Sequence, residues 1–312
     1  MIWLEGELSI HINQKRDELP KHAKAFTPKY PYIPKLQDYS RAAQNSWWRH
    51  WPTLSWDDGK LLKSTINSRK LMIWADCAND PEKSLLKEIS KDLTHGCDLG
   101  TRGPNLCPSV STNAPSAYKY GDRVTDSIVD GIIKGILIGP MNEDEIPFES
   151  VKVNGIMVTF KDSGAAQVIL NLSRGDPFDV NSGMYNDDRF NVTMSSTNRW
   201  LRALHSAGVG CFIVKLDWVA AFKQLRVQHQ DVRQQFFCWA GKYFAELCLV
   251  FGGSSSVGLF DRLAKRFRYA ATKLSNMPPE QVEQIIDDVV AAGTKQQVNR
   301  FYVKYREIAE VC

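Results

Sequence analysis

Two adjacent acids lie inside an apolar stretch near the end of this 312-residue chain. Asp287 and Asp288 are flanked by Ile-Ile at 285–286 and by Val-Val at 289–290. This pattern is typical of a short buried hairpin, in which neighbouring carboxylates are unfavourable unless a positive charge lies between them. Oxygen ligands of this kind suit a divalent cation such as Mg²⁺. The pair therefore predicts a cation-binding hairpin, and the simpler alternative is an ordinary hairpin turn with solvated acids.

A third acid strengthens the cation-binding interpretation. Two other Asp-Asp pairs, at 57–58 and 187–188, lie in polar sequence and are most simply solvated turns. Asp217 instead ends the apolar strand predicted at 211–217, where alternation puts Lys215 on the same face. Carboxylates from separate strands can hold two metal ions about 3.5–4 Å apart, which activate an attacking hydroxyl and stabilise a leaving pyrophosphate. The acids thus predict a site for phosphoryl transfer.

The composition allows a nucleic-acid partner without requiring one. Lys and Arg total 39 against 35 Asp and Glu, a net charge of +4, which is only mildly basic. The length predicts one large domain or two smaller ones, and a hydrophobic content of 43% is enough for a packed core. No apolar run could span a bilayer and no signal peptide is visible, so we expect an intracellular protein with no membrane partner.

The cysteine pattern gives no indication of a disulfide framework or a zinc ribbon. The seven cysteines are scattered and no Cys-x-x-Cys occurs. His95, Cys97 and Cys107 are conceivable metal ligands. Reduced thiols in an intracellular protein are the simpler interpretation.

The first part of the chain lacks sustained periodicity. Residues 1–80 are rich in Trp, Pro, Lys and Tyr, and we expect them to form an irregular N-terminal extension. Trp47, Trp48, Trp51 and Trp56 cluster within it. They could stack on bases, and the alternative is that they pack on a neighbouring domain or partner.

Beyond residue 80 the hydrophobic pattern changes between helical and strand periods. Helices are expected at 81–92, 122–134, 197–207, 252–274 and 296–310. Besides the strand at 211–217, two hairpins are expected, at 156–160 with 168–172 and at 236–239 with 243–247. In the helix that begins at Thr197, we expect Trp200, Leu201 and Leu204 to face inward.

Three sequence blocks, in this order, resemble reverse transcriptases. They are residues 216–227 (LDWVAAFKQLRV), 250–260 (VFGGSSSVGLF) and 286–288 (IDD). They are similar to that family's first palm motif, its Phe-Gly…Ser…Phe motif and its paired-acid hairpin. The sequences of these blocks most resemble those of retrotransposons of the tyrosine-recombinase (DIRS-like) type. The resemblance covers roughly residues 120–312.

The resemblance implies an α+β right-hand polymerase fold. Its palm would be an antiparallel sheet backed by helices, preceded by fingers. We expect an irregular extension at 1–80, a helical lead-in and fingers at 81–210, and a truncated palm at 211–312. A thumb, the later palm segments and a ribonuclease H domain have no counterpart in this sequence, so the isolated chain is expected to be weakly active or inactive.

The resemblance also assigns the metal site. Asp217 and Asp287 would be the main ligands of two Mg²⁺ (or Mn²⁺) ions, and Asp288 would be an accompanying, more peripheral acid. The backbone along the incoming triphosphate would be that of Trp218, Val219, Ala220 and Ala221.

Further residues would contact the nucleotide. Phe222 would be a steric gate that excludes a ribose 2′-OH; the alternative is a core aromatic, and one residue can have both roles. Gly252, Gly253 and Ser254 would line the nucleotide and template, because small residues allow close approach. Lys161, in the finger hairpin, would reach the triphosphate, and its alternative is a solvated turn lysine.

The implied reaction is template-directed transfer of deoxynucleotides to a primer 3′-OH. The partners would be an RNA or DNA template with its primer, dNTPs, and other domains of the element's polyprotein. Gln167 stands where the family offers a basic residue, which favours the alternative of a non-catalytic nucleic-acid-binding remnant. A third reading is an RNA-dependent RNA polymerase, against which Phe222 argues because such enzymes admit the 2′-OH.

Overall fold

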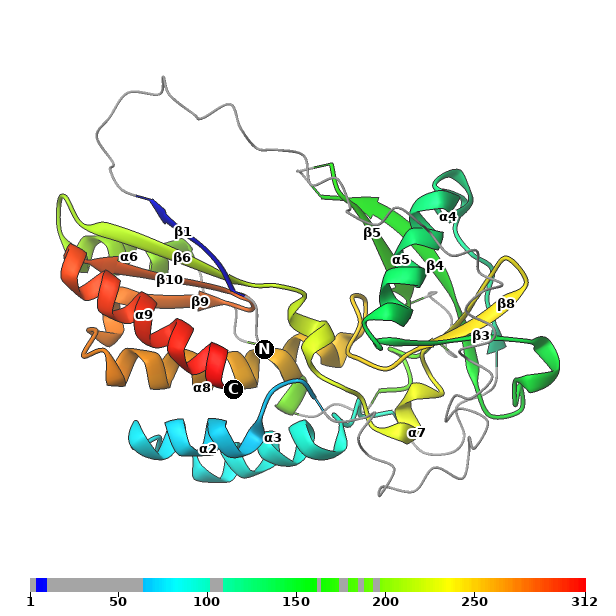
Figure 1. Ribbon diagram of the computed structural model, residues 1–312, viewed down its shortest axis with the longest axis horizontal. Helices are drawn as coiled ribbons and strands as arrows, with labels where there is room; N and C mark the ends of the chain where they lie inside the picture. The colour runs from blue at the N-terminus through cyan, green and yellow to red at the C-terminus, as the bar shows by residue number, and fades with distance from the viewer. Residues whose placement is uncertain are drawn as a thin grey trace.

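The computed structural model describes residues 4–9, 64–101, 109–161, 164–173, 179–184, 188–192 and 197–312. Within these ranges the chain is mixed α and β, with two β-sheets (Figure 1). The predicted tryptophan cluster, the acid pair at 57–58 and Cys107 lie outside the described residues.

One sheet carries the three acids and is called the acid-bearing sheet below. It has four antiparallel strands in the order β1, β6, β10, β9. Their bounds are β1 (Leu4–Ser9), β6 (Phe212–Trp218), β9 (Val282–Ile285) and β10 (Asp288–Gly293). The strand predicted at 211–217 and the hairpin predicted at the paired acids are confirmed.

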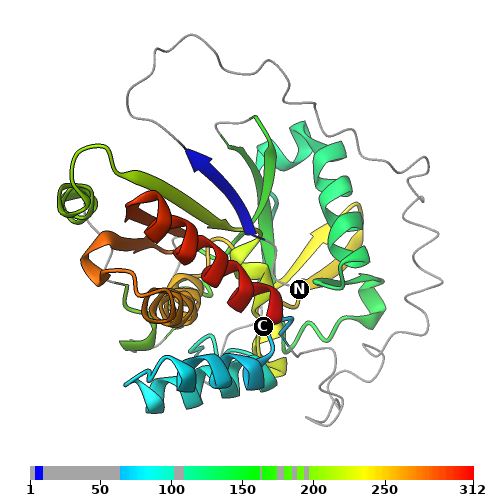
Figure 2. The ribbon, with the colours of Figure 1, turned by 60° about the vertical axis from the view of Figure 1, so that its left-hand side comes forward.

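Two long helices cover one face of this sheet. They are α8 (Ser254–Leu274) and α9 (Lys295–Val311), and they also pack against each other (Figure 1, Figure 2). The buried Trp218 ring of β6 meets Phe260 of α8 edge-on, at 5.4 Å between ring centroids. Its Nε1 donates to the Tyr305 hydroxyl of α9 at 2.8 Å. Alternation along β6 then places Lys215 and Asp217 on the opposite face, away from these helices.

The second sheet, called the mixed sheet, has strand order β2, β4, β7, β8, β3, with β5 also paired to β4. The pairs β2–β4 and β4–β7 are parallel, and β3–β8, β4–β5 and β7–β8 are antiparallel. The bounds are β2 (Ser109–Val110), β3 (Leu137–Met141), β4 (Lys152–Phe160), β5 (Ala166–Asn171), β7 (Phe236–Trp239) and β8 (Lys242–Glu246).

Two helices and a second core support the mixed sheet. The helices α4 (Pro115–Lys119) and α5 (Gly121–Ile133) contact β4, β5 and β3. Val124 and Ile128, spaced one helical turn apart, pack into a buried cluster that also contains Phe237 of β7. Both hairpins predicted for this region are therefore confirmed, and they share one hydrophobic core.

A helical hairpin formed by α2 (Ser68–Cys77) and α3 (Lys83–His95) packs against α8. In both views it lies below α8 and α9 (Figure 1, Figure 2). The side chain of Asp80, between the two helices, is completely buried and pairs with Arg266 of α8 at 2.9 Å. Within the range 1–80, predicted to be irregular, the structure therefore places strand β1 and helix α2.

Short helices connect these larger elements. They are η3 (Glu143–Glu145), η4 (Asp188–Phe190), α6 (Thr197–Ala207), η5 (Ala221–Gln224), α7 (His229–Val232) and η6 (Pro279–Gln281). Helix α6 contacts β9, β10 and η6. The expectation that Leu201 faces inward is wrong, because its side chain is 56% exposed.

One element lies in an unexpected place. The hairpin β7–β8 falls within the range predicted as palm, yet its strands belong to the mixed sheet, through the pairing of β7 with β4. The predicted domain boundaries at 80 and 210 stay predictions. Among the described residues, no helix has the length and hydrophobicity that crossing a membrane would require.

Candidate functional site

The three acids predicted from the sequence lie together at one end of the acid-bearing sheet. Asp217 is next to last in β6, and it pairs directly with Asp288, the first residue of β10. Directly paired residues of antiparallel strands project from the same face. Asp287 lies just before Asp288 in the turn between β9 and β10, which Ile285 and Asp288 close by pairing. The hairpin thus brings together acids that are far apart in the sequence.

The turn that carries Asp287 has an uncommon backbone conformation. Ile286 has a φ of 53°, which β-branched residues rarely adopt. Its carbonyl accepts a hydrogen bond from Gln284 Nε2 at 2.9 Å, and its side chain packs against the main core. Such a conformation costs on the order of 1–3 kcal/mol and is typical of functional sites, where the surrounding structure holds it in place.

Burial and mutual repulsion raise the pKa values of two of the acids. Burial is the largest cause for Asp217, followed by the charges of Asp287 and Asp288, while Lys215 lowers its pKa. Burial also raises the pKa of Asp287 most, a backbone hydrogen bond lowers it, and Asp288 adds a further rise. The positive charges of Lys215 and Lys161 lower it. These side chains therefore form one electrostatic cluster that favours added positive charge.

One ammonium group already lies within this cluster. Lys215 Nζ is 2.9 Å from Asp288 Oδ2. This hydrogen bond is the largest cause of the raised Lys215 pKa, and Asp217 and Asp287 raise it further. One lysine beside three carboxylates leaves an excess of negative charge at this end of the sheet.

Lys161 approaches the acids from the mixed sheet. It directly follows β4, and its backbone closes the turn to β5 by donating to the Ala165 carbonyl at 3.0 Å. Its side chain is exposed, and its charge is a small influence on the Asp287 pKa, opposing the net rise that burial causes. The structure therefore brings the predicted finger lysine near the predicted metal ligands.

The donor chemistry of the cluster fits a hard divalent cation, because all three candidate ligands are carboxylates. Within the described ranges, however, no group of three or more His, Cys, Asp or Glu side chains is arranged to hold a metal ion. The Asp288 oxygen is engaged by Lys215. Asp217 and Asp287 are accordingly the carboxylates best suited to contact a cation.

The chain turns away from the sheet directly after Asp217. The Trp218 side chain is buried on the opposite face, so only its backbone remains near the acids. Val219 and Ala220 are exposed, and Ala220 has a φ of 51°, which directs the chain into η5. Ala221 is buried. Of the stretch predicted to lie along a triphosphate, residues 219–220 are therefore the exposed part.

Phe222 lies in η5 and is buried, with 7% of its surface exposed. Its ring makes edge-on contacts with Phe251, at 5.0 Å between centroids, and with Phe260 of α8, at 5.8 Å. Edge-on aromatic pairs of this kind stabilise by about 0.5–1.5 kcal/mol beyond burial. Phe222 is therefore a core aromatic at the base of the loop that leads to α8.

The glycine-rich loop predicted to line a nucleotide begins with Gly252 and Gly253 and leads into Ser254, the first residue of α8. Gly252 has a φ of 95°, and a Cβ there would lie 2.8 Å from the Leu170 carbonyl oxygen of β5. A side chain at this position would therefore be strained and would clash with backbone. The loop passes close to β5 because residue 252 is glycine.

Sequence reasoning missed Asn181. It lies between the hairpin predicted at 156–172 and the helix predicted at 197–207, where no element is expected, yet its side chain hydrogen-bonds Ser173, Gly252 and Ser254. No periodicity or flanking pattern distinguishes this asparagine from others in polar loops, so its contacts could be found only from the tertiary structure.

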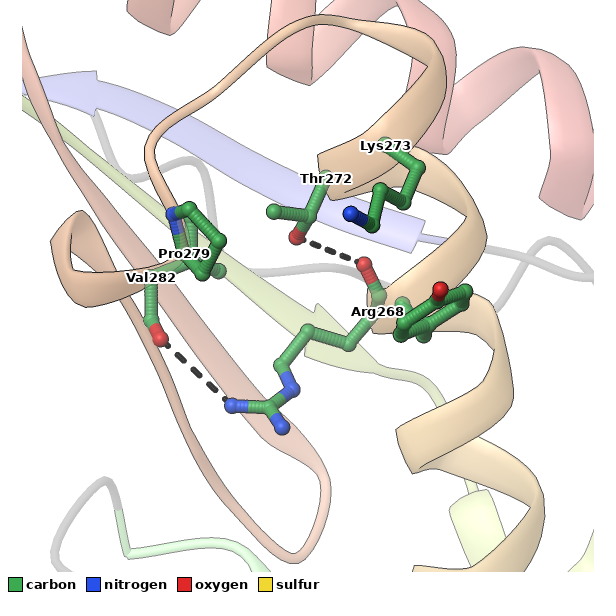
Figure 3. A pocket seen from close by; sticks show the side chains of 6 residues that line it. Arg268, Thr272, Lys273, Pro279 and Val282 are labelled. Atoms are coloured by element: carbon green, nitrogen blue, oxygen red, sulfur yellow. Dashed lines mark hydrogen bonds between the residues drawn. The ribbon is translucent and has the colours of Figure 1, made fainter. Parts of the chain in front are cut away.

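A separate small pocket of about 80 Å³ lies between α8, η6 and the start of β9. It is lined by Arg268, Tyr269, Thr272, Lys273, Pro279 and Val282. Figure 3 shows the Arg268 guanidinium pointing toward the Val282 carbonyl, to which it donates at 3.4 Å. Burial lowers the pKa of Arg268. The pocket adjoins the opposite end of β9 from the acids and does not include them.

Comparisons with known proteins give a structural likeness without a sequence match. No family model matches the chain, and no curated protein matches it. A foamy virus protease-reverse transcriptase in complex with double-stranded DNA aligns with a TM-score of 0.50 and 15% identity, over 83% of this chain and 42% of that chain. The same viral protein in complex with an RNA/DNA hybrid gives a TM-score of 0.49 and 16% identity, over 83% and 32%.

The chain spans less than half the length of the viral chain in both structures, at 42% and 32%. At 15% identity the first likeness concerns the fold alone. The structure has a reverse-transcriptase-like fold.

Proposed function

We propose that this chain is the polymerase core of an RNA-directed DNA polymerase from a DIRS-like retroelement. It would extend a primer 3′-OH with deoxynucleotides on an RNA or DNA template and release pyrophosphate. The observation that carries the proposal is the convergence of Asp217, Asp287 and Asp288 at the end of the acid-bearing sheet. The likeness of the fold to a reverse transcriptase structure supports it.

Asp217 and Asp287 are the proposed ligands of two Mg²⁺ ions, with Mn²⁺ as a substitute. When bound, the ions would supply positive charge that stabilises the attacking hydroxyl and the leaving pyrophosphate. Lys215 holds Asp288 to one side through its 2.9 Å ion pair, so Asp288 has the role of accompanying acid. The raised pKa values of Asp217 and Asp287 mean that both carboxylates accept positive charge readily.

The proposed nucleotide position lies between the acids and the loop before α8. The backbone of the exposed residues 219–220 would lie along the triphosphate, and Lys161 would contribute a positive charge from the β4–β5 turn. Phe222 is both a core aromatic and the proposed gate against a ribose 2′-OH, since Phe251 and Phe260 hold its ring in place. Gly252, Gly253 and Ser254 would line the base and the template. The remaining domains of an element polyprotein are further proposed partners.

The gate distinguishes this proposal from an RNA-dependent RNA polymerase. We expect deoxynucleotides to be incorporated in preference to ribonucleotides when both are offered in competition on one primed template. Equal use of both, or a preference for ribonucleotides, would favour the RNA polymerase reading.

The primary experiment is Mg²⁺-dependent incorporation of one labelled deoxynucleotide into a primed template. Asp287→Asn keeps the side-chain shape and removes the charge, and we expect it to reduce incorporation by at least about a hundredfold, in line with the loss of a main electrostatic contributor. The matched control is Asp126→Asn, an exposed acid on α5, which should leave incorporation within about twofold, as surface substitutions usually do. Equal incorporation by wild type and Asp287→Asn would exclude the two-metal mechanism.

One observation favours a second candidate, a nucleic-acid-binding remnant without catalysis. Gln167 of β5, paired with Thr159, is neutral where the resemblance leads us to expect a basic residue. A neutral amide cannot balance the charge of a triphosphate. Binding of primed template without any incorporation, by a folded wild-type chain with Mg²⁺ or Mn²⁺, would support this candidate.

A further inference from the structure

We propose that Asn181 is a positioning residue that holds the loop from Gly252 to Ser254 in the shape needed to receive a nucleotide. The inference rests on the proposed function, because that function makes this loop part of the nucleotide site. Asn181 itself lies outside the three sequence blocks that point to the function.

The side-chain amide of Asn181 uses both of its ends on the same loop. Its Nδ2 donates to the Gly252 carbonyl at 2.7 Å, and its Oδ1 accepts from the Ser254 N–H at 3.0 Å. The two bonds go to the residues on either side of Gly253. Together they resemble the donor and acceptor that the peptide groups of a neighbouring strand would offer. An asparagine amide offers this donor and acceptor together, whereas a carboxylate of the same shape offers acceptors only.

These contacts satisfy groups that would otherwise lack partners. The first N–H groups of a helix have no intrahelical acceptor, and Gly253, which precedes α8, has no side chain to supply one. Asn181 supplies it from a distant part of the sequence. The Oδ1 contact therefore caps α8, and the Nδ2 contact fixes the peptide before it.

The same asparagine is anchored to the end of β5. Its Nδ2 also donates to the Ser173 hydroxyl at 2.5 Å, and its backbone N–H donates to the Leu172 carbonyl at 3.1 Å. Gly252 approaches β5 directly, at the Leu170 carbonyl. Asn181 thus links β5 of the mixed sheet to the first turn of α8, which packs under the acid-bearing sheet.

This position predicts an effect on binding more than on chemistry. Within the described part of the chain, the side chain of Asn181 hydrogen-bonds the loop and Ser173, and none of the three acids. A loosened loop would weaken the nucleotide's contacts in the ground state and transition state alike, which raises KM and leaves kcat nearly unchanged.

The test compares Asn181→Asp and Asn181→Ala with wild type. Asn181→Asp keeps the size and the acceptor for Ser254 and removes the donor to Gly252. Asn299→Asp is the matched control, because Asn299 is exposed on α9, which covers the face of the acid-bearing sheet opposite the acids. Each chain is examined for amide hydrogen exchange of residues 250–256 without ligand, and for kcat and KM of single-deoxynucleotide incorporation.

We expect roughly tenfold faster exchange at Ser254 in Asn181→Ala, and roughly tenfold higher KM in both variants, since one hydrogen bond contributes about a factor of ten or less. The kcat should stay within about twofold, and Asn299→Asp should match wild type. Unchanged exchange and KM in both variants would overturn the inference, as would a loss confined to kcat. The exchange measurement needs no substrate, so a wild-type chain without incorporation would refute the polymerase proposal while exchange still decides whether Asn181 holds the loop.

Discussion

Asp231 shows how burial and hydrogen bonding compete at a single carboxylate. Its side chain accepts from the Leu99 N–H at 2.9 Å and from the Thr101 hydroxyl at 2.6 Å, which ties residues 99–101 to α7. Both bonds favour the ionised form, but burial outweighs them and raises the pKa to about 6, with a smaller contribution from Asp98. The folded protein therefore takes up a proton at Asp231 at a higher pH than the unfolded chain does.

This shift predicts that stability falls as pH rises from about 4 to about 6, because the folded state then binds more protons than the unfolded state. A shift from 3.8 to about 6 corresponds to roughly 3 kcal/mol, at about 1.4 kcal/mol per pH unit. Asp231→Asn can keep both contacts, since its oxygen can accept from Leu99 and its amide can donate to Thr101. Urea unfolding between pH 4 and 7 should therefore show a flatter profile for Asp231→Asn than for wild type. Parallel profiles would show that Asp231 titrates normally.

Single residues were predictable where their immediate sequence carries the physical signal. Asp217, Asp287 and Asp288 stand out because apolar neighbours make an unpaired charge there unfavourable. Asn181 has polar neighbours, and its importance comes from partners more than 70 residues away, which no local pattern encodes. Lys215 is intermediate: alternation placed it beside Asp217, but its partner Asp288 follows only from the strand register.

At the scale of elements, the contact between α8 and η4 depends on the absence of a side chain. Gly258 lies in the interior of α8, and a Cβ there would be 2.5 Å from the Phe190 Cα and 2.6 Å from its carbonyl carbon and oxygen. Backbone cannot yield as a flexible side chain can. Phe190 also packs against the main core, so η4 covers part of α8 through this close approach.

Gly258→Ala tests which of two opposing effects dominates. Helix propensity alone predicts that alanine stabilises α8 by about 1 kcal/mol. The backbone clash predicts a loss of roughly 1–3 kcal/mol, as overpacking usually gives. We expect a net decrease in the free energy of unfolding, measured with urea, and we expect Lys273→Ala on an exposed position of α8 to change it little. If Gly258→Ala instead raises the free energy of unfolding, η4 can move away from α8 at little cost.

Elements were predictable in type and approximate bounds, but their assignment to sheets was not. The expected helix at 296–310 is α9, Lys295–Val311, because its apolar stripe and the Thr294–Gln297 capping box are both local signals. The β7–β8 hairpin was also expected, yet its membership in the mixed sheet comes from the pairing of β7 with β4, some 80 residues earlier. Strand alternation indicates which face of a strand is buried, but it does not indicate which sheet the strand joins.

At the scale of the whole molecule, the α2–α3 hairpin and the residues just before it contact segments from much later in the chain. The Asn67 N–H donates to the Cys312 carbonyl, and Ser64 donates through its hydroxyl to the Gln224 carbonyl. The Asp80–Arg266 pair joins the turn between α2 and α3 to α8, and its carboxylate is completely buried while its guanidinium is 13% exposed. Asp80 Oδ1 also accepts from the Glu82 N–H at 2.9 Å.

Removing one partner of a buried ion pair leaves the other charge without compensation, and this is more damaging than removing both. Arg266→Met should therefore lower the free energy of unfolding by about 3 kcal/mol or more, and the double variant Asp80→Asn with Arg266→Met should recover part of that loss. Arg306→Met is the matched control, because Arg306 pairs with Glu310 in α9 with about half of each side chain exposed, and exposed pairs of this kind contribute little to stability. If Arg266→Met lowers the free energy of unfolding no more than Arg306→Met does, the contact of the α2–α3 hairpin with α8 depends on its apolar residues alone. A double-variant cycle measured by urea unfolding distinguishes stabilisation by the ion pair from stabilisation by apolar contacts alone. Only an interacting pair gives a loss in the free energy of unfolding that the second substitution partly reverses.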